Sequence, residues 1–186
     1  MSIKSRNDLG SYLNSLGLSG NGIEIGVYKA RFSHVLLSTS KLSKIYLLDA
    51  WKHFDPSEYP DRSNLEQNAM DQMYLNVVEA MKQYGERVVV LRKDSRDAFL
   101  EFQDGFFDFV YIDANHAYEF TKADLTNWYP KLKSGGVFSG HDYFDNPPVY
   151  GVKSAVDEFC GRIGVTLLVT GEQSRKSQPS WYFVKP

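Results

Sequence analysis

The sequence predicts an α/β fold with a mainly parallel sheet, and three observations support this prediction. Short apolar runs alternate along the chain with segments whose apolar residues recur at helical spacing, an order typical of βαβ units. The run at residues 88–91 is apolar at every position, as in strands that are buried on both faces. The chain has 186 residues, of which 42% are hydrophobic and 24% charged, which is typical of one globular domain.

The first half of the chain is expected to hold three helices and three strands. Leucines at spacings of three and four predict the first helix, and a glycine-rich stretch ends it. The third helix is long and carries an apolar face that we interpret as core. Residues 51–63 contain two prolines and no period, so they are predicted to form a loop. Helices are expected at 5–16, 30–38 and 64–84, and strands at 22–27, 44–49 and 87–92.

The second half continues the alternation and then changes it. The last two strands are separated by the polar stretch 171–180, which is too short for a crossover and favours an antiparallel hairpin. The complete prediction is a doubly wound, mainly parallel seven-stranded sheet with an antiparallel C-terminal hairpin. Helices are expected at 96–102, 118–132 and 151–163, and strands at 107–113, 136–140, 165–170 and 181–184.

Charge and composition exclude several classes of partner. The chain has 21 basic and 23 acidic residues and a net charge of −2, which argues against nucleic acid or an anionic membrane as the main partner. No apolar run reaches the length of a transmembrane helix, and the polar N-terminus does not resemble a signal peptide. The single cysteine, Cys160, fits a reducing compartment. We therefore expect a cytoplasmic protein with a small-molecule substrate. The sequence is also compatible with a homodimer.

Acidic residues stand in or beside five predicted strands, four of them at or just after a strand end and Glu24 inside the first strand. Ligands of an open parallel sheet bind beyond the carboxyl ends of its strands. A single acid there is most often a helix cap, but five in corresponding places indicate a binding site. These residues are Glu24, Asp49, Asp94, Asp113 and Asp142.

The loop after the first strand suits an anionic or polar ligand. Gly26 permits a tight turn and a close approach of the backbone, and the next helix directs its free N–H groups there. The loop is neither G-x-G-x-x-G nor a P-loop, which argues against a dinucleotide or a nucleoside triphosphate. An ordinary βα turn remains an alternative. Asp49 could accept both hydroxyls of a ribose, Asp94 could bind an adenine edge or cap a helix, and Trp51 could cover a base.

These residues resemble the class I S-adenosylmethionine-dependent methyltransferases. Residues 24–28 look like the opening strand and turn of that family, and Ala30 stands where many members have a further glycine. Residues 133–137 resemble its Leu-x-Pro-Gly-Gly turn, with Ser134 in place of proline. The resemblance implies a Rossmann-like fold in one domain, 1–186, with an N-terminal helical segment at 1–20 and a core at 22–186. It also implies that S-adenosylmethionine is bound by Glu24, Gly26, Val27, Tyr28, Ser33, Asp49, Ala50, Trp51, Asp94, Ser95 and Asp113.

A narrower resemblance concerns two short segments. Residues 113–116 and 140–143 look like the metal-dependent O-methyltransferases of the catechol and macrocin type. The resemblance implies that Asp113 and Asp142 hold Mg²⁺ and that His116 is the base. The sequence departs from the catechol enzymes, which have lysine at the base position and asparagine where Tyr143 stands. A histidine with a pKa near 6.5 suits a general base at neutral pH, and such a base adds roughly 10²–10⁴-fold to the rate.

The function expected from these residues is O-methylation of a small hydroxylated molecule, such as a sugar, a phenol or a natural product. His116 and Asp113 are the expected catalytic residues, and His141, Tyr143 and Tyr150 are expected to contact the substrate. Three alternatives remain: an N-methyltransferase without metal, a dinucleotide-binding oxidoreductase, and a non-catalytic module that binds the cofactor.

Overall fold

The computed structural model describes residues 3–57, 59–147, 149–171 and 178–186. Within them, the main sheet has seven strands in the order β3-β2-β1-β4-β5-β9-β8. The first five strands of the chain run parallel, and β9 pairs antiparallel with both β5 and β8. The predicted mainly parallel sheet with an antiparallel C-terminal hairpin is therefore confirmed. The strands are β1 (Asn21–Ile25), β2 (Lys44–Asp49), β3 (Val88–Arg92), β4 (Phe107–Ile112), β5 (Leu132–Gly140), β8 (Leu168–Val169) and β9 (Trp181–Val184).

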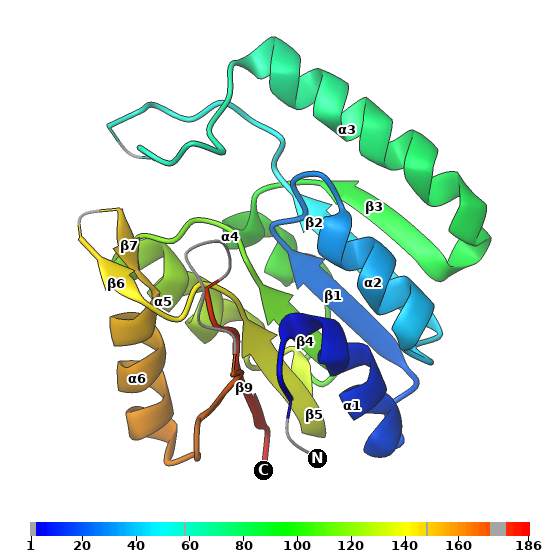
Figure 1. Cartoon of the computed structure of the whole chain (residues 1–186), viewed down its shortest axis with the longest axis vertical. Helices are drawn as coiled ribbons and strands as arrows, with labels where there is room; N and C mark the ends of the chain where they lie inside the picture. Colours follow the sequence, from blue (N-terminus) through cyan, green and yellow to red (C-terminus); the bar gives the residue numbers. More distant parts are fainter. Residues whose placement is uncertain (1–2, 58, 148, 172–177) are drawn as a thin grey trace.

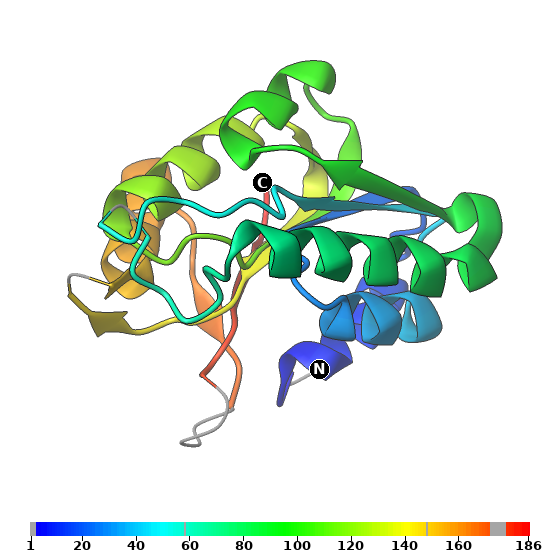
Figure 2. The same cartoon turned by 90° about the horizontal axis from the view of Figure 1, so that it is seen from above.

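Helices cover both faces of the sheet, as Figures 1 and 2 show. One layer holds η1 (Arg6–Asp8), α1 (Leu9–Ser15), α2 (Arg31–Thr39) and α3 (Gln67–Met81). The other holds α4 (Ser95–Ala98), η3 (Phe99–Glu101), α5 (Tyr118–Trp128) and α6 (Val152–Ile163). Among the described residues, no helix combines the length and the apolar character that crossing a membrane requires.

The central strand β4 explains this layering. All six of its residues are buried, and successive side chains of a strand point to opposite faces. Phe109 and Tyr111 pack into the cluster beneath α1, α2 and α3. Val110 and Ile112 pack into the cluster beneath α5 and α6. A strand that is buried at every position thus requires a helical layer on each side.

Several element boundaries differ from the prediction. Residues 88–91 of β3 are half-buried rather than buried on both faces, because β3 is an edge strand of the sheet. The long helix ends at Met81 and is followed by the 3₁₀ segment η2 (Lys82–Arg87), in which Gly85 has a φ of 55°. Helix α5 ends at Trp128 and β5 begins at Leu132, earlier than predicted, whereas β8 is shorter than predicted. The two-residue strands β6 (Asp145–Asn146) and β7 (Tyr150–Gly151) were not predicted.

Candidate active site

A cavity of about 390 Å³ lies at the carboxyl ends of the parallel strands. This volume is in the range of small-molecule sites. Its wall combines residues that follow β1, β2, β3 and β4, so segments far apart in the sequence meet there. Of the residues predicted from the sequence, the cavity is lined by Glu24, Gly26, Val27, Tyr28, Asp49, Ala50, Trp51, Asp94, Ser95, Asp113 and His116.

The backbone around this cavity is strained at four residues with side chains. Their φ angles are 50° at Tyr28, 56° at Ala30, 39° at Trp51 and 51° at Asp142. Such left-handed conformations cost free energy and are concentrated at functional sites. Ala30 thus occupies a conformation that suits glycine, the residue expected there from the resemblance.

The turn after β1 is built around Gly26 and Asp49. Gly26 has a φ of 91°, and a Cβ atom there would lie 1.9 Å from the carbonyl oxygen of Asp113. The carboxylate of Asp49 accepts hydrogen bonds from the backbone N–H groups of Val27 at 3.0 Å, Tyr28 at 2.8 Å and Trp51 at 2.8 Å. Burial raises the pKa of Asp49 against these three bonds. Asp49 therefore fixes the turn, and a carboxylate with about four lone-pair sites can still accept from a ribose.

Glu24 and Ser33 form a buried pair beneath the same turn. The hydroxyl of Ser33 donates to Oε2 of Glu24 at 2.5 Å. Glu24 is 2% exposed, and burial raises its pKa to about 8. Ser33 is fully buried and does not line the cavity itself. It contacts Glu24, which does line the cavity.

The end of the cavity near β3 holds Asp94, Ser95 and Asp124. Asp94 caps α4 by accepting from the backbone N–H of Arg96 at 2.9 Å, and it pairs with the guanidinium of Arg96 at 2.6 Å. The capping alternative is thus realised, while Asp94 also lines the cavity. Asp124 of α5 is 2% exposed, and burial raises its pKa to about 7 although Ser95 donates a hydrogen bond to it. In the sequence Asp124 is an ordinary polar helix residue, and nothing distinguished it.

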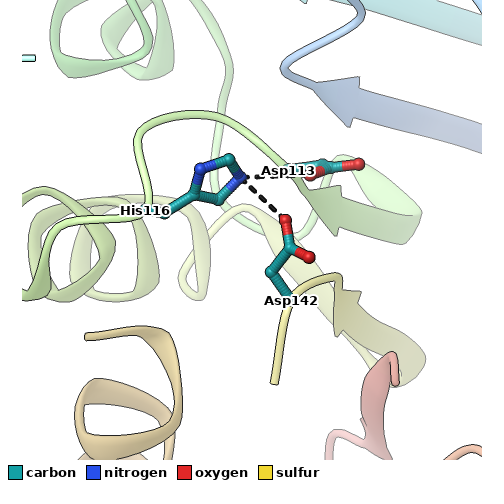
Figure 3. A group of neighbouring side chains, drawn as sticks. All are labelled: Asp113, His116 and Asp142. Carbon is teal, nitrogen blue, oxygen red and sulfur yellow. Dashed lines mark ion pairs between the residues drawn. The ribbon is translucent and has the colours of Figure 1, made fainter. Parts of the chain in front are cut away.

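His116 lies between three carboxylates, two of which Figure 3 shows. Its Nε2 atom is 3.0 Å from Oδ2 of Asp142 and 3.5 Å from Oδ1 of Asp113. Its Nδ1 atom is 3.3 Å from Oδ2 of Asp61. Burial alone would lower the pKa of His116, but these three carboxylates raise it well above its usual value. The arrangement stabilises an imidazolium and makes the neutral ring a stronger base.

No individual role was predicted for Asp61, because it lies in a loop that contains two prolines and no period. A hydrogen bond from His116 holds the pKa of Asp61 far below its usual range. The hydroxyl of Tyr150 donates to the same Oδ2 atom at 2.9 Å, and the Tyr150 ring stacks on His116 with centroids 4.9 Å apart. The loop after β2 and the hairpin of β6 and β7 therefore meet at His116.

The donor set of Asp113, His116 and Asp142 fits a divalent cation. One possible ligand atom from each lies within 4.8 Å of the others. Among the described residues, Nε2 of His116 is buried without an aligned hydrogen-bond partner. Carboxylate oxygens are the ligands that Mg²⁺ prefers, and an imidazole nitrogen also suits transition-metal ions.

The residues predicted to contact substrate lie in different places. Tyr150 is part of the His116 cluster. His141 is buried, and its Nδ1 atom is 2.9 Å from Oγ of Ser180. Tyr143 donates to Asp157 of α6 at 2.5 Å, so its hydroxyl is engaged with α6. Residues of the cavity wall that were not assigned to any role from the sequence include Arg6, Asn115, Phe120 and Asp124.

Residues 23–143 match the family model described as a methyltransferase domain. A curated relative, the uncharacterized protein y4gI of Sinorhizobium fredii, is 33% identical over 72 residues. That match covers 39% of this chain and only 8% of the relative, so the chain spans a small part of the relative's length.

Solved structures share the fold at low sequence identity. The O-methyltransferase NovP has a TM-score of 0.69 and 18% identity, over 97% of this chain and 77% of its own. An O-methyltransferase from Bacillus cereus in complex with SAH has a TM-score of 0.66 and 17% identity, over 97% and 80%. The N-methyltransferase NodS from Bradyrhizobium japonicum has a TM-score of 0.64 and 15% identity, over 96% and 95%. At these identities the likeness concerns the fold alone.

Proposed function

The chain belongs to this methyltransferase family, whose members use S-adenosylmethionine, and on that premise we propose that it methylates a hydroxyl oxygen of a small molecule. One observation carries the proposal: the imidazole of His116 lies at the cavity wall between the carboxylates of Asp61, Asp113 and Asp142. A hydroxyl must lose a proton as it attacks a methyl group, and a buried imidazole surrounded by carboxylates can accept it.

We assign the cofactor to the part of the cavity between β1 and β3. Gly26 lets the backbone approach the cofactor closely, and Asp49 is available to the ribose hydroxyls. Ser95 and Asp94 border the space for the adenine. Methyl transfer is an in-line displacement, so holding the donor and the acceptor in line can supply on the order of 7–11 kcal/mol of the barrier.

The proton transfer falls to His116. Asp61 accepts from Nδ1 and so fixes the tautomer in which Nε2 can receive a proton. S-adenosylmethionine, when bound, would supply the methyl group to the acceptor oxygen, with the electron pair of the broken carbon–sulfur bond left on sulfur. The acceptor hydroxyl would give its proton to Nε2 of His116. The positive charge of a bound sulfonium would oppose a second positive charge nearby, which would favour a neutral imidazole before the transfer.

Asp113 and Asp142 are the residues that would hold a divalent cation. Such an ion would lower the pKa of the acceptor hydroxyl when bound. In the protein itself these two carboxylates position His116 and favour its charged form. The carboxylate oxygens that would bind an ion are the same ones that stabilise the protonated imidazole. Binding of an ion to Asp113 and Asp142 would therefore compete with protonation of His116.

The acceptor side of the cavity suits a flat or ring-shaped molecule. Phe54 and Tyr59 pack edge to face with centroids 6.0 Å apart, and both line the cavity. Asp61 and Asn115 add polar groups on the same wall. Aromatic walls with a few polar groups are typical of small-molecule sites, and a sugar or a phenol has the matching apolar faces and hydroxyls.

Methyl transfer to a panel of hydroxylated sugars, phenols and matched amines, with radiolabelled S-adenosylmethionine, tests this proposal. We expect hydroxyl compounds to be methylated and His116→Gln to lower kcat by roughly 10²–10⁴-fold. S-adenosylhomocysteine affinity should stay within about threefold. His34→Gln is the matched control, because His34 lies on α2 and contacts Tyr84. Unchanged turnover in His116→Gln, or methylation of the amines alone, would refute the proposal, the second result in favour of N-methylation.

A further inference from the structure

Arg6 brings a cation from the N-terminal segment into the cavity. Its Nη1 atom lies 3.0 Å from Oδ2 of Asp113, across 107 positions of the sequence. Its guanidinium carbon lies 5.5 Å from the centre of the Phe32 ring, and the side chain is 28% exposed. Arg6 is therefore a partly buried wall residue rather than a mobile surface arginine.

The fold fixes the segment that carries Arg6. Ser5 and Asp8 form a capping box around η1, and the side chain of Asp8 also accepts from the backbone N–H of Lys4 at 2.9 Å. Ile3 and Leu9 on either side are 3% and 0% exposed. This anchoring limits the conformational entropy that Arg6 would lose on binding a ligand.

The charges of the cofactor decide which group Arg6 can face. S-adenosylmethionine carries a sulfonium, an α-ammonium and one anion, the α-carboxylate. An arginine next to either cation would weaken binding, whereas its planar fork of N–H donors matches a carboxylate. The same wall holds two acids, Glu24 and Asp113. Acidic side chains suit the sulfonium and the α-ammonium of the cofactor.

We propose that Arg6 binds the α-carboxylate of the methionine moiety of S-adenosylmethionine, beside its contact with Asp113. This inference rests on the proposed use of the cofactor site. It makes the N-terminal segment part of that site, although the family match begins at residue 23. A purely structural role, in which Arg6 only ties η1 to Asp113, is the competing explanation.

Two ligands separate these explanations in calorimetric titrations. S-adenosylhomocysteine has the carboxylate, and 5′-methylthioadenosine lacks the whole amino-acid moiety. We expect Arg6→Gln to weaken S-adenosylhomocysteine binding by about 10- to 100-fold, the range of a hydrogen-bonded charge. Binding of 5′-methylthioadenosine should change by less than about threefold, and Arg6→Lys should recover part of the loss.

Arg162→Gln is the control, because Arg162 is an exposed residue of α6 that packs over the Phe159 ring, away from the residues lining the cavity. It should bind both ligands as the wild type does. Equal losses for the two ligands in Arg6→Gln, no loss for either, or a selective loss in Arg162→Gln instead would overturn the inference. A wild-type protein that binds neither ligand would instead contradict the proposed cofactor site itself.

Discussion

Asp61 and His116 are in contact at 3.3 Å although they are 55 positions apart in the sequence. The contact joins the loop after β2 to the loop after β4. A third segment, β7, adds Tyr150, whose hydroxyl donates a 2.9 Å hydrogen bond to Asp61. A carboxylate that accepts from one nitrogen of an imidazole fixes the tautomer and makes the other nitrogen more basic. In the proposed reaction Asp61 is thus a positioning residue that acts through His116.

We predict that Asp61→Asn lowers kcat by about 10- to 100-fold, as is typical when an orienting carboxylate is lost. The KM for the cofactor should change little, since Asn keeps the shape of the side chain. Asp55→Asn is the matched control, because Asp55 lies in the same loop and is exposed, with hydrogen bonds to Ser57. Steady-state methyl transfer measures both variants. Equal effects of the two substitutions would contradict the positioning role.

The turn at Gly26 offers a second test. We predict that Gly26→Ala destabilises the protein by at least about 2 kcal/mol and abolishes S-adenosylhomocysteine binding, because a Cβ atom would lie 1.9 Å from the Asp113 carbonyl oxygen. Gly161→Ala in α6 is the control. No atom approaches its Cβ position within 4 Å, so alanine should stabilise the helix by about 0.5–1 kcal/mol. Urea denaturation and titration calorimetry measure the two variants, and a Gly26→Ala protein as stable as the wild type would show that the turn can relax.

Local sequence patterns predicted most of the fold because strand and helix periodicity depend on neighbouring residues. Strand β2 and strand β9 have the predicted bounds. The helix and strand ends that were predicted wrongly are determined by tertiary structure. The residues of β3 are as apolar as those of an inner strand, and only the order of the sheet makes β3 an edge.

The same distinction holds for the site. Asp113, His116 and Asp142 follow strands directly, so their place at the sheet edge could be read from the sequence. Arg6 and Asp61 come from a helical segment and an irregular loop, and only the fold brings them to the cavity. The acceptor cannot be derived in this way, because the shape of its pocket depends on contacts between loops.

Metal removal tests the carboxylate pair. We predict that dialysis against EDTA lowers methyl transfer by at least about 10-fold and that Mg²⁺ or Mn²⁺ restores it, because the ion would lower the pKa of the acceptor hydroxyl. Electron paramagnetic resonance should show Mn²⁺ binding to the wild type and a much weaker signal of bound ion in Asp142→Asn. Asp145→Asn is the control, since Asp145 bonds to Ser154 of α6. Full activity after dialysis, without bound metal, would leave His116 as a base that needs no ion.

Asp124 gives a prediction for the pH dependence of stability. Burial raises its pKa to about 7, whereas an aspartate of the unfolded chain has a pKa near 3.9. The folded state therefore binds the extra proton between these values, and the contribution of Asp124 to stability falls as the pH rises from about 4 to about 7. The carboxylate that then forms has Asp94 as an acidic neighbour and Arg96 as a basic one.

Asp124→Asn removes this titration while keeping a polar group for Ser95. Relative to the wild type, the variant should gain free energy of unfolding as the pH rises from 5 to 8, by up to about 3 kcal/mol, and the gain should level off above pH 7. Urea denaturation at several pH values measures the difference. Asp97→Asn controls for the loss of an aspartate, because Asp97 is an exposed residue of α4. A difference between Asp124→Asn and wild type that is constant from pH 5 to 8 would mean that Asp124 is ionised throughout, so the cavity near β3 would carry a buried negative charge at every pH tested.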